Sequence, residues 1–214
     1  MYILEIKNAG TAKGKYKVCL EGGTDFVLYR KELAKFDLKE GQDLSEDTYE
    51  QILREVQIPR AKKRAMHLLE KMDRTEQQLI SKLKENGYAP EAISEAVEYV
   101  KSYHYIDDDR YARSYIRIHQ ENKSKKRLQL DLMRKGIDKE IIEYALEEEF
   151  EQSEEEMIQV LLKKKHYDPG CKDRKQRDKM YRFLMQRGFS SSDISRAIGQ
   201  YENCYEDDNN PYIQ

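Results

Sequence analysis

The sequence has no tryptophan and few of the residues that interrupt helices. It contains 10 glycines and 4 prolines among 214 residues, whereas 37% of its residues are charged and 38% are hydrophobic. A chain with this balance has little apolar material for one large globular core and favours charged, solvent-rich helices. The composition therefore predicts a mainly α-helical protein.

Cysteines and long apolar runs are also scarce. The three cysteines, Cys19, Cys171 and Cys204, are scattered and odd in number, which argues against a disulfide framework. No apolar run approaches the length of a membrane span, and the start of the chain carries no signal-peptide pattern. We expect a cytoplasmic protein that makes no contact with a membrane.

What the sequence does contain is a threefold repeat. The segments Leu83–Tyr88, Leu132–Ile137 and Leu184–Phe189 each hold a leucine, three mostly polar residues, a glycine and an apolar residue. Their glycines lie 49 and 52 residues apart, so the repeat is about fifty residues long. Matching apolar residues flank the three copies at equal spacings: Leu79, Leu128 and Met180; Ile93, Ile142 and Ile194; Ala96, Ala145 and Ala197; Val97, Leu146 and Ile198.

Each repeat predicts a helix, a glycine stop and a second helix. Leu79 and Leu83 are four residues apart and share one helix face. Gly87 follows where a left-handed C-terminal cap is needed. Ile93 and Val97 are again four apart and begin the inner stripe of the next helix. These residues are therefore expected in the core, and they define the fold rather than the ligand.

Three tandem three-helix repeats follow a small β-containing unit in the predicted organisation. We expect the N-terminal unit in residues 1–58, with three short strands before residue 30, and repeats in 59–106, 107–152 and 153–202. The acidic tail 203–214 is expected to be disordered. Because each repeat has few apolar residues, neighbouring repeats should pack on each other and form an elongated, curved array.

Helix starts are marked by capping residues. Ser45, Thr75 and Ser124 are predicted N-caps, and the segment 75–78 fits a capping box. Asp138 is a candidate cap, and Ser153–Glu156 fits a second capping box. In the third repeat either of two serines can cap the last helix; they are Ser191 and Ser192.

The pattern offers little chemistry. Asp107–Asp109 could hold a divalent metal, but an N-cap with acidic residues in the first helical turn explains them better. His166 and Cys171 lie five residues apart without the two further ligands that zinc needs. There is no paired nucleophile and base and no phosphate-binding glycine loop. We expect neither an enzyme nor a bound metal or cofactor.

Charge alternates in blocks along the helical part. Arg110–Lys139 holds ten basic and three acidic residues, Glu140–Glu156 nine acidic and no basic residues, and Lys163–Arg187 ten basic and three acidic residues. Such blocks indicate either a polyanion or acidic protein surface as partner, or solvated helix faces with pairing inside the protein. The pattern alone leaves both interpretations open.

Basic residues near helix starts or on one helix face are the candidate binding residues. They are Arg110, Arg113, Arg117, Lys123, Lys125, Lys126, Arg127, Lys163, Lys164, Lys165, Arg174, Lys175 and Arg177. Tyr103, Tyr105 and Tyr115 could stack on bases or pack inside the protein.

These features together resemble the RecX regulatory family. The resemblance is carried by the triple leucine–glycine repeat, the segment Tyr105–Ala112 and the basic start Lys125-Lys126-Arg127, and it covers about residues 60 to 201. The third repeat departs from the pattern in the loop Asp168-Pro169-Gly170.

The resemblance implies a monomeric modulator of the bacterial RecA recombinase. It implies binding to RecA and to its filament on single-stranded DNA, weak contact with DNA, and inhibition of the ATPase, co-protease and recombinase activities by limiting filament growth or promoting disassembly. Homologous recombination, DNA repair and the SOS response would be regulated in this way.

Two other classes remain open. One is an autonomous DNA-binding module, such as a helix-turn-helix regulator or a nucleoid-type protein, although a net charge of −2 argues against strong autonomous binding. The other is a passive helical adaptor for a different protein, which would have no effect on any recombinase.

Overall fold

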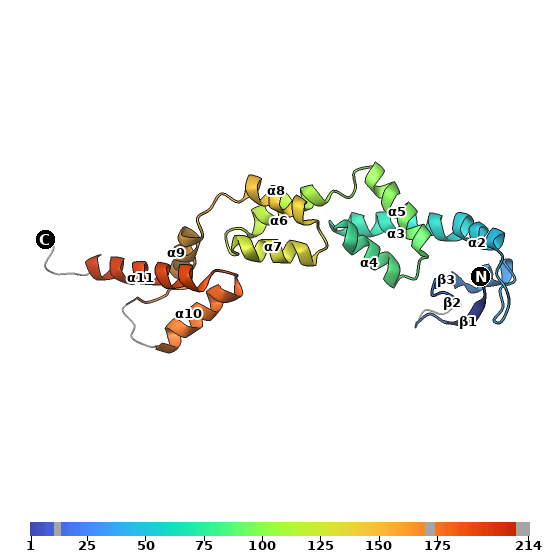
Figure 1. Cartoon of the computed structure of the whole chain (residues 1–214), viewed down its shortest axis with the longest axis horizontal. Coiled ribbons are helices and arrows are strands. Elements are labelled where there is room, and N and C mark those ends of the chain that lie inside the picture. Colours follow the sequence, from blue (N-terminus) through green and yellow to red (C-terminus); the bar gives the residue numbers. More distant parts are fainter. Residues whose placement is uncertain (11–13, 170–173, 209–214) are drawn as a thin grey trace. The chain divides into compact units, whose positions relative to one another are not determined.

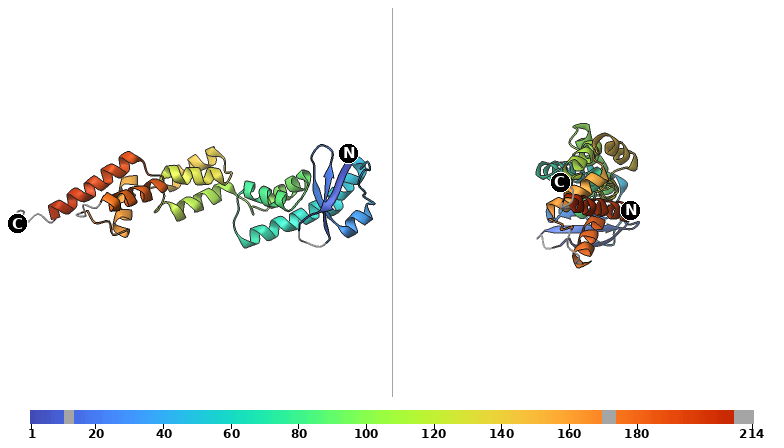
Figure 2. Two further views of the ribbon diagram at one scale, coloured as in Figure 1. Left: turned by 90° about the horizontal axis from the view of Figure 1, so that it is seen from below. Right: turned by 90° about the vertical axis from the view of Figure 1, so that its left-hand side faces the viewer.

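The computed structural model describes residues 1–10, 14–169 and 174–208. The chain divides into two compact units, unit 1 from Met1 to Asp108 and unit 2 from Asp109 to Gln214. In Figure 1 and the left view of Figure 2, the strands lie together in the part of unit 1 that holds the N-terminus. The predicted fold class, three three-helix repeats preceded by a small sheet, is confirmed.

Unit 1 begins with an antiparallel sheet of three strands in sequence order, β1 (Ile3–Asn8), β2 (Lys15–Leu20) and β3 (Phe26–Tyr29). Val18 pairs with both Ile6 and Phe26, so these side chains share the face that packs on the core. Gly22 and Gly23 have positive φ in the turn between β2 and β3, as the predicted hairpin requires.

The helices of unit 1 pack on this sheet. They are α1 (Arg30–Lys35), α2 (Glu46–Ile52), the π-helical turn η1 (Leu53–Gln57), α3 (Ile58–Lys71), α4 (Glu76–Glu85) and α5 (Pro90–Ser102). Helical structure is continuous from α2 through η1 into α3, and Pro59 lies in the first turn of α3, where its missing N–H costs little. One buried apolar cluster contains residues from the strands and from α3, α4 and α5.

Unit 2 holds the second and third repeats. Its helices are α6 (Asp108–His119, beginning at the last residue of unit 1), α7 (Lys125–Arg134), α8 (Lys139–Glu149), α9 (Glu154–Lys164), α10 (Arg174–Gln186) and α11 (Ser191–Asp208). Each repeat has its own small core, and Phe150 packs against both. Residues 203–208, which we expected in an acidic tail, belong to α11, since no proline occurs before Pro211. The rest of that tail, 209–214, lies outside the described residues.

The three repeat glycines adopt the predicted left-handed conformation. Their φ angles are 81° at Gly87, 83° at Gly136 and 90° at Gly188. The flanking columns of leucine, isoleucine, alanine and valine predicted for the core are all buried. The sequence interpretation of the repeat as helix, glycine cap and helix is confirmed.

Two of these glycines also permit close contact with the preceding module. At Gly87 a Cβ atom would overlap Val27 Cγ2, and the Gly87 carbonyl accepts a hydrogen bond from Val27 N–H at 2.8 Å. At Gly188 a Cβ would lie 2.5 Å from Ser124 Oγ and 2.6 Å from Arg127 Cβ. A side chain at either position would push two modules apart.

Most helix starts follow the sequence prediction. Ser45 Oγ accepts from Thr48 N–H, Ser124 Oγ accepts from Arg127 N–H, and Thr75 forms the expected capping box with Gln78.

Three of the predicted caps were wrong in detail. Asp138 and Ser153 stand at N-cap positions, but neither side chain makes the capping hydrogen bond. The start of α11 is capped by Ser190, whose Oγ accepts from Asp193 N–H at 3.1 Å, rather than by Ser191 or Ser192. Near Ser153 the adjacent carboxylate is used elsewhere, as described below.

Candidate functional site

The predicted arginines of α6 are paired within unit 2. Arg113 Nε lies 2.8 Å from Asp109 Oδ2, and its Nη1 lies 3.3 Å from Glu149 Oε1. Arg117 donates two hydrogen bonds to the same Glu149 carboxylate, one of them 2.6 Å long. The hydrogen bond from Arg117 holds the pKa of Glu149 below its ordinary value. One carboxylate at the end of α8 therefore partly neutralises two candidate cations.

A second carboxylate holds two further candidates between α6 and α7. Asp131 lies 2.9 Å from Lys123 Nζ and 3.1 Å from Arg127 Nε, and its side chain is only 12% exposed. Burial raises the pKa of Asp131, but the hydrogen bond and charge of Lys123 and the charge of Arg127 outweigh it, so the pKa falls below its ordinary value. Lys123 and Arg127 are thus fixed in position, and part of their charge is compensated.

Aromatic rings line the same side of α6. Tyr111 and Tyr115 stack with their ring centres 6.4 Å apart, and His119 follows with its ring centre 4.3 Å from that of Tyr115. Lys135 Nζ donates to the Tyr111 hydroxyl at 3.0 Å, and Lys123 Nζ donates to the Tyr115 hydroxyl at 2.8 Å. Tyr115 is therefore half-buried in a network that joins α6 to α7.

The predicted basic start of α7 is more open. Lys125 and Lys126 are exposed, and no ion pair joins either side chain to another described residue. The backbone N–H of Lys125 donates to Glu154 Oε1 at 3.0 Å, so this carboxylate from the start of α9 already occupies the helix N-terminus. Arg110, in the first turn of α6, is also exposed.

The candidate cations of the third repeat lie at the surface. Lys164 is 3.5 Å from Glu121, and Lys165 Nζ stands 5.2 Å from the centre of the Phe183 ring. Within the described part of the chain, three exposed cations make no ion pair. They are Lys163, Arg174 and Arg177. Lys175 is also exposed, and the loop 170–173 between α9 and α10 lies outside the described residues.

Tyr103 and Tyr105 differ from Tyr115. They lie in unit 1 and are 59% and 47% exposed, with ring centres 6.1 Å apart. Tyr99 continues this group, with its ring centre 5.0 Å from that of Tyr103. Of the two interpretations left open by the sequence, burial therefore fails for Tyr103 and Tyr105.

Sequence reasoning missed the two carboxylates that hold the candidate cations. Asp131 follows Arg127 by four residues on one helix, so helical spacing could have revealed that pair. Glu149 lies 32 residues from Arg117. No local spacing could have shown this second pairing, which depends on how α8 packs against α6.

The aspartates of Asp107–Asp109 act as hydrogen-bond and ion-pair partners. Asp108 accepts from the backbone N–H of Glu76 at 3.0 Å, and burial raises the pKa of Asp108. No group of three or more His, Cys, Asp or Glu side chains in the described residues is arranged to hold a metal ion. A search of the same residues finds no helix that is both long and apolar enough to span a membrane.

A small sheet followed by three three-helix modules with charged surfaces defines a helical repeat protein. Family profiles match each module in turn: RecX, first three-helix domain, at 61–99; RecX, second three-helix domain, at 107–146; and RecX, third three-helix domain, at 153–198. These matches cover more than half of the chain, and the chain belongs to the RecX family of regulatory proteins.

Individual relatives agree with this assignment. The chain is 30% identical over 186 residues to the regulatory protein RecX of Caldanaerobacter subterraneus subsp. tengcongensis, covering 86% of this chain and 92% of the relative. It is 33% identical over 139 residues to that of Vibrio campbellii, covering 64% and 89%.

Solved structures agree as well. A crystal structure of regulatory protein RecX matches with a TM-score of 0.56 and 27% identity, covering 92% of this chain and 98% of the other. RecX from Lactobacillus salivarius matches with a TM-score of 0.57 and 27% identity, covering 69% and 97%.

Proposed function

We propose that this protein binds the RecA recombinase and its filament on single-stranded DNA and inhibits the recombinase, ATPase and co-protease activities. Inhibition would follow from limited filament growth or promoted disassembly, and the protein would act as a cytoplasmic monomer without a cofactor. Membership of the RecX family is the observation that carries this proposal. The structure offers a plausible surface for it in the open cations of unit 2.

Those cations suit an acidic protein surface or DNA phosphate. Lys125, Lys126, Lys163, Arg174 and Arg177 are exposed and make no ion pair with described residues. Unpaired surface lysine and arginine can contact a polyanion without first breaking an internal pair. The candidates Arg113 and Arg117 must instead compete with Glu149 for their charge.

The decisive experiment is the single-stranded-DNA-dependent ATPase of the cognate RecA, titrated with this protein. We expect the rate to fall well below one molecule per RecA, since capping or groove binding acts on many subunits at once. Unchanged ATPase at molar excess of helical protein would contradict the proposal.

A charge reversal locates the surface. We expect Lys125→Glu with Lys126→Glu to weaken inhibition while helix content stays the same, because neither side chain is used to hold the fold. Arg127 is left unchanged in this variant, since it pairs with Asp131. If inhibition survives the reversal, this patch is only a solvated helix face.

A DNA-binding module that acts alone is the second candidate, favoured by the exposed tyrosines Tyr103 and Tyr105. It predicts binding to naked single-stranded DNA that falls steeply with salt, and no dependence on RecA. Anisotropy of a labelled oligonucleotide at two salt concentrations separates the two candidates.

A further inference from the structure

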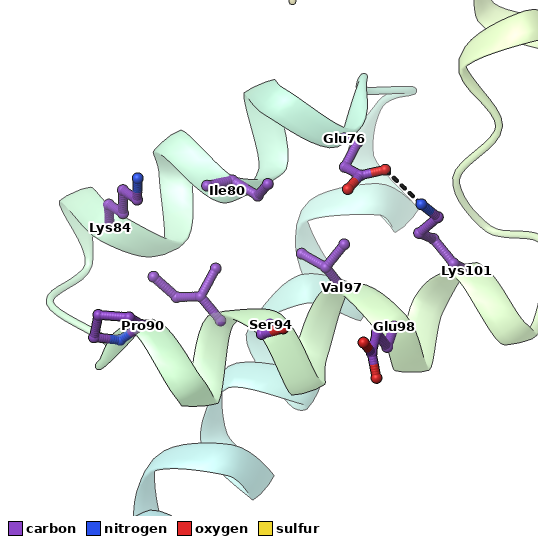
Figure 3. Close-up of a pocket in the computed structure, with 9 residues that line it drawn as sticks. Glu76, Ile80, Lys84, Pro90, Ser94, Val97, Glu98 and Lys101 are labelled. Carbon is purple, nitrogen blue, oxygen red and sulfur yellow. Dashed lines mark hydrogen bonds and ion pairs between the residues drawn. The ribbon is translucent and has the colours of Figure 1, made fainter.

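An apolar pocket of about 390 Å³ lies between α4 and α5 in unit 1. Figure 3 shows Ile80 from α4 pointing toward Pro90 and Val97 from α5, with charged side chains around the rim. The volume lies near the lower end of the 300–1,000 Å³ that is typical of ligand pockets, at roughly the size of one or two side chains. The lining residues recur every three or four positions along both helices, so the pocket is a groove parallel to them.

The equivalent surface is built differently in the other repeats. Counting from the repeat glycine, Ile80 and Pro90 correspond to Gln129 and Lys139 in the second repeat and to Tyr181 and Ser191 in the third.

In the third repeat, the Tyr181 hydroxyl donates a hydrogen bond to Ser191 Oγ and so bridges α10 and α11 where the first repeat leaves an apolar opening. The same three-helix module therefore folds without this groove. Packing within the module does not explain why both groove positions are apolar in the first repeat.

Charges at the two ends of the groove differ in sign. Lys84 stands near Pro90 at one end, and Glu98 stands at the other, beside the ion pair of Glu76 and Lys101 at 2.7 Å. Within the described residues neither Lys84 nor Glu98 makes an ion pair. A bound segment would meet a positive charge at the start of α5 and a negative charge about two turns further along.

We propose that this groove docks an amphipathic helix of the recombinase, which rests on the proposed function and adds a contact made by unit 1. The helix would place one or two apolar side chains over Ile80 and Val97, an acidic residue near Lys84 and a basic residue near Glu98. Acidic residues favour helix N-termini and basic residues C-termini, so the docked helix runs parallel to α5.

Closing the groove tests this directly. Ile80→Tyr with Pro90→Ser installs the arrangement that the third repeat already uses, so the module should still fold. We expect about tenfold more of this full-length variant to be needed for half-inhibition of the RecA ATPase, as for loss of one buried anchor. Gln77→Tyr adds the same side chain to an exposed position of α4 outside the groove and should inhibit like wild type.

Circular dichroism and thermal unfolding establish that both variants are folded. A folded closed-groove variant that inhibits like wild type overturns the groove proposal and leaves the proposed function standing. A wild-type protein that never inhibits RecA overturns the proposed function itself.

A photo-crosslinking amino acid in place of Ser94, on the exposed rim, identifies the occupant with purified RecA filaments as the probe. We expect a crosslink to a RecA helix that carries its acidic residue before and its basic residue after the apolar anchor. A crosslink only to the same chain or to a second copy of it, or none to RecA, overturns the proposal.

Discussion

The second and third repeats carry almost the same basic charge in sequence, but the structure leaves it available to different degrees. In the second repeat, Glu149 and Asp131 each hold two cations. In the third, Lys163, Arg174 and Arg177 make no ion pair with described residues. A count of lysine and arginine therefore overstates the surface charge of the second repeat. A polyanionic partner gains most from cations whose counter-charges are mobile ions rather than fixed carboxylates.

The largest effect should come from breaking the contact that joins these two repeats. Gly188→Ala places a Cβ 2.5 Å from Ser124 Oγ and requires a left-handed conformation at φ 90°. We expect a loss of about 3 kcal/mol in unfolding free energy, since backbone strain and overpacking each cost roughly 1–3 kcal/mol. Urea unfolding measures it.

Gly199→Ala is the matched control. Gly199 lies inside α11 without a positive φ, and a Cβ there would meet nothing within 4 Å. Here alanine should stabilise the protein by up to about 1 kcal/mol through helix propensity. Equal losses at the two glycines would contradict the role assigned to the contact at Gly188.

Next in size is the difference between open and held cations. We expect the triple variant Lys163→Glu, Arg174→Glu and Arg177→Glu to need about tenfold more protein for half-inhibition of RecA, with the deficit shrinking at high salt. Arg113→Gln with Arg117→Gln should change inhibition less, because Glu149 already compensates both cations. The reverse order would place the contact surface on α6.

Much of the fold followed from short-range patterns. Gly87 marks a cap because a leucine stripe ends four residues before it, and Thr75 marks a helix start through its spacing to Gln78. The candidate site was harder, since its cations were visible in the sequence while their counter-ions were not. The pairing of Arg117 with Glu149 depends on the packing of two helices 32 residues apart in sequence.

The pairing in the second repeat can be removed at its centre. Asp131→Asn keeps the shape of the side chain but takes away the charge that holds Lys123 and Arg127. We expect about 1 kcal/mol lower unfolding free energy, as for a partly exposed network of charged hydrogen bonds. The variant also raises the net positive charge of this face, so binding of RecA filaments should strengthen slightly. Unchanged stability would make the network incidental.

The smallest effects distinguish the two repeats by the sign of their pH dependence. The pKa of Asp131 is lowered from 3.8, so its stabilisation is complete above pH 3.8 and is lost as the pH falls through the folded-state pKa. Glu154 has the opposite shift: burial raises its pKa above 4.5, only partly offset by the hydrogen bond from Lys125 N–H, and Asp193 raises it further. Its ionised form therefore costs stability above the raised pKa, and this cost is relieved as the pH falls towards 4.5.

Glu154→Gln makes that difference measurable. The glutamine carbonyl can still accept from Lys125 N–H, so the helix start stays capped without a half-buried charge. We expect the variant to gain a few tenths of a kcal/mol over wild type at pH 7 and to lose this advantage near pH 4, where the wild-type carboxyl becomes protonated. Asp131→Asn should behave in the opposite way, with its deficit at pH 7 vanishing below pH 3. Unfolding curves of the three proteins at pH 7, 4 and 3 compare them, and parallel pH profiles would mean that these two carboxylates are solvated alike.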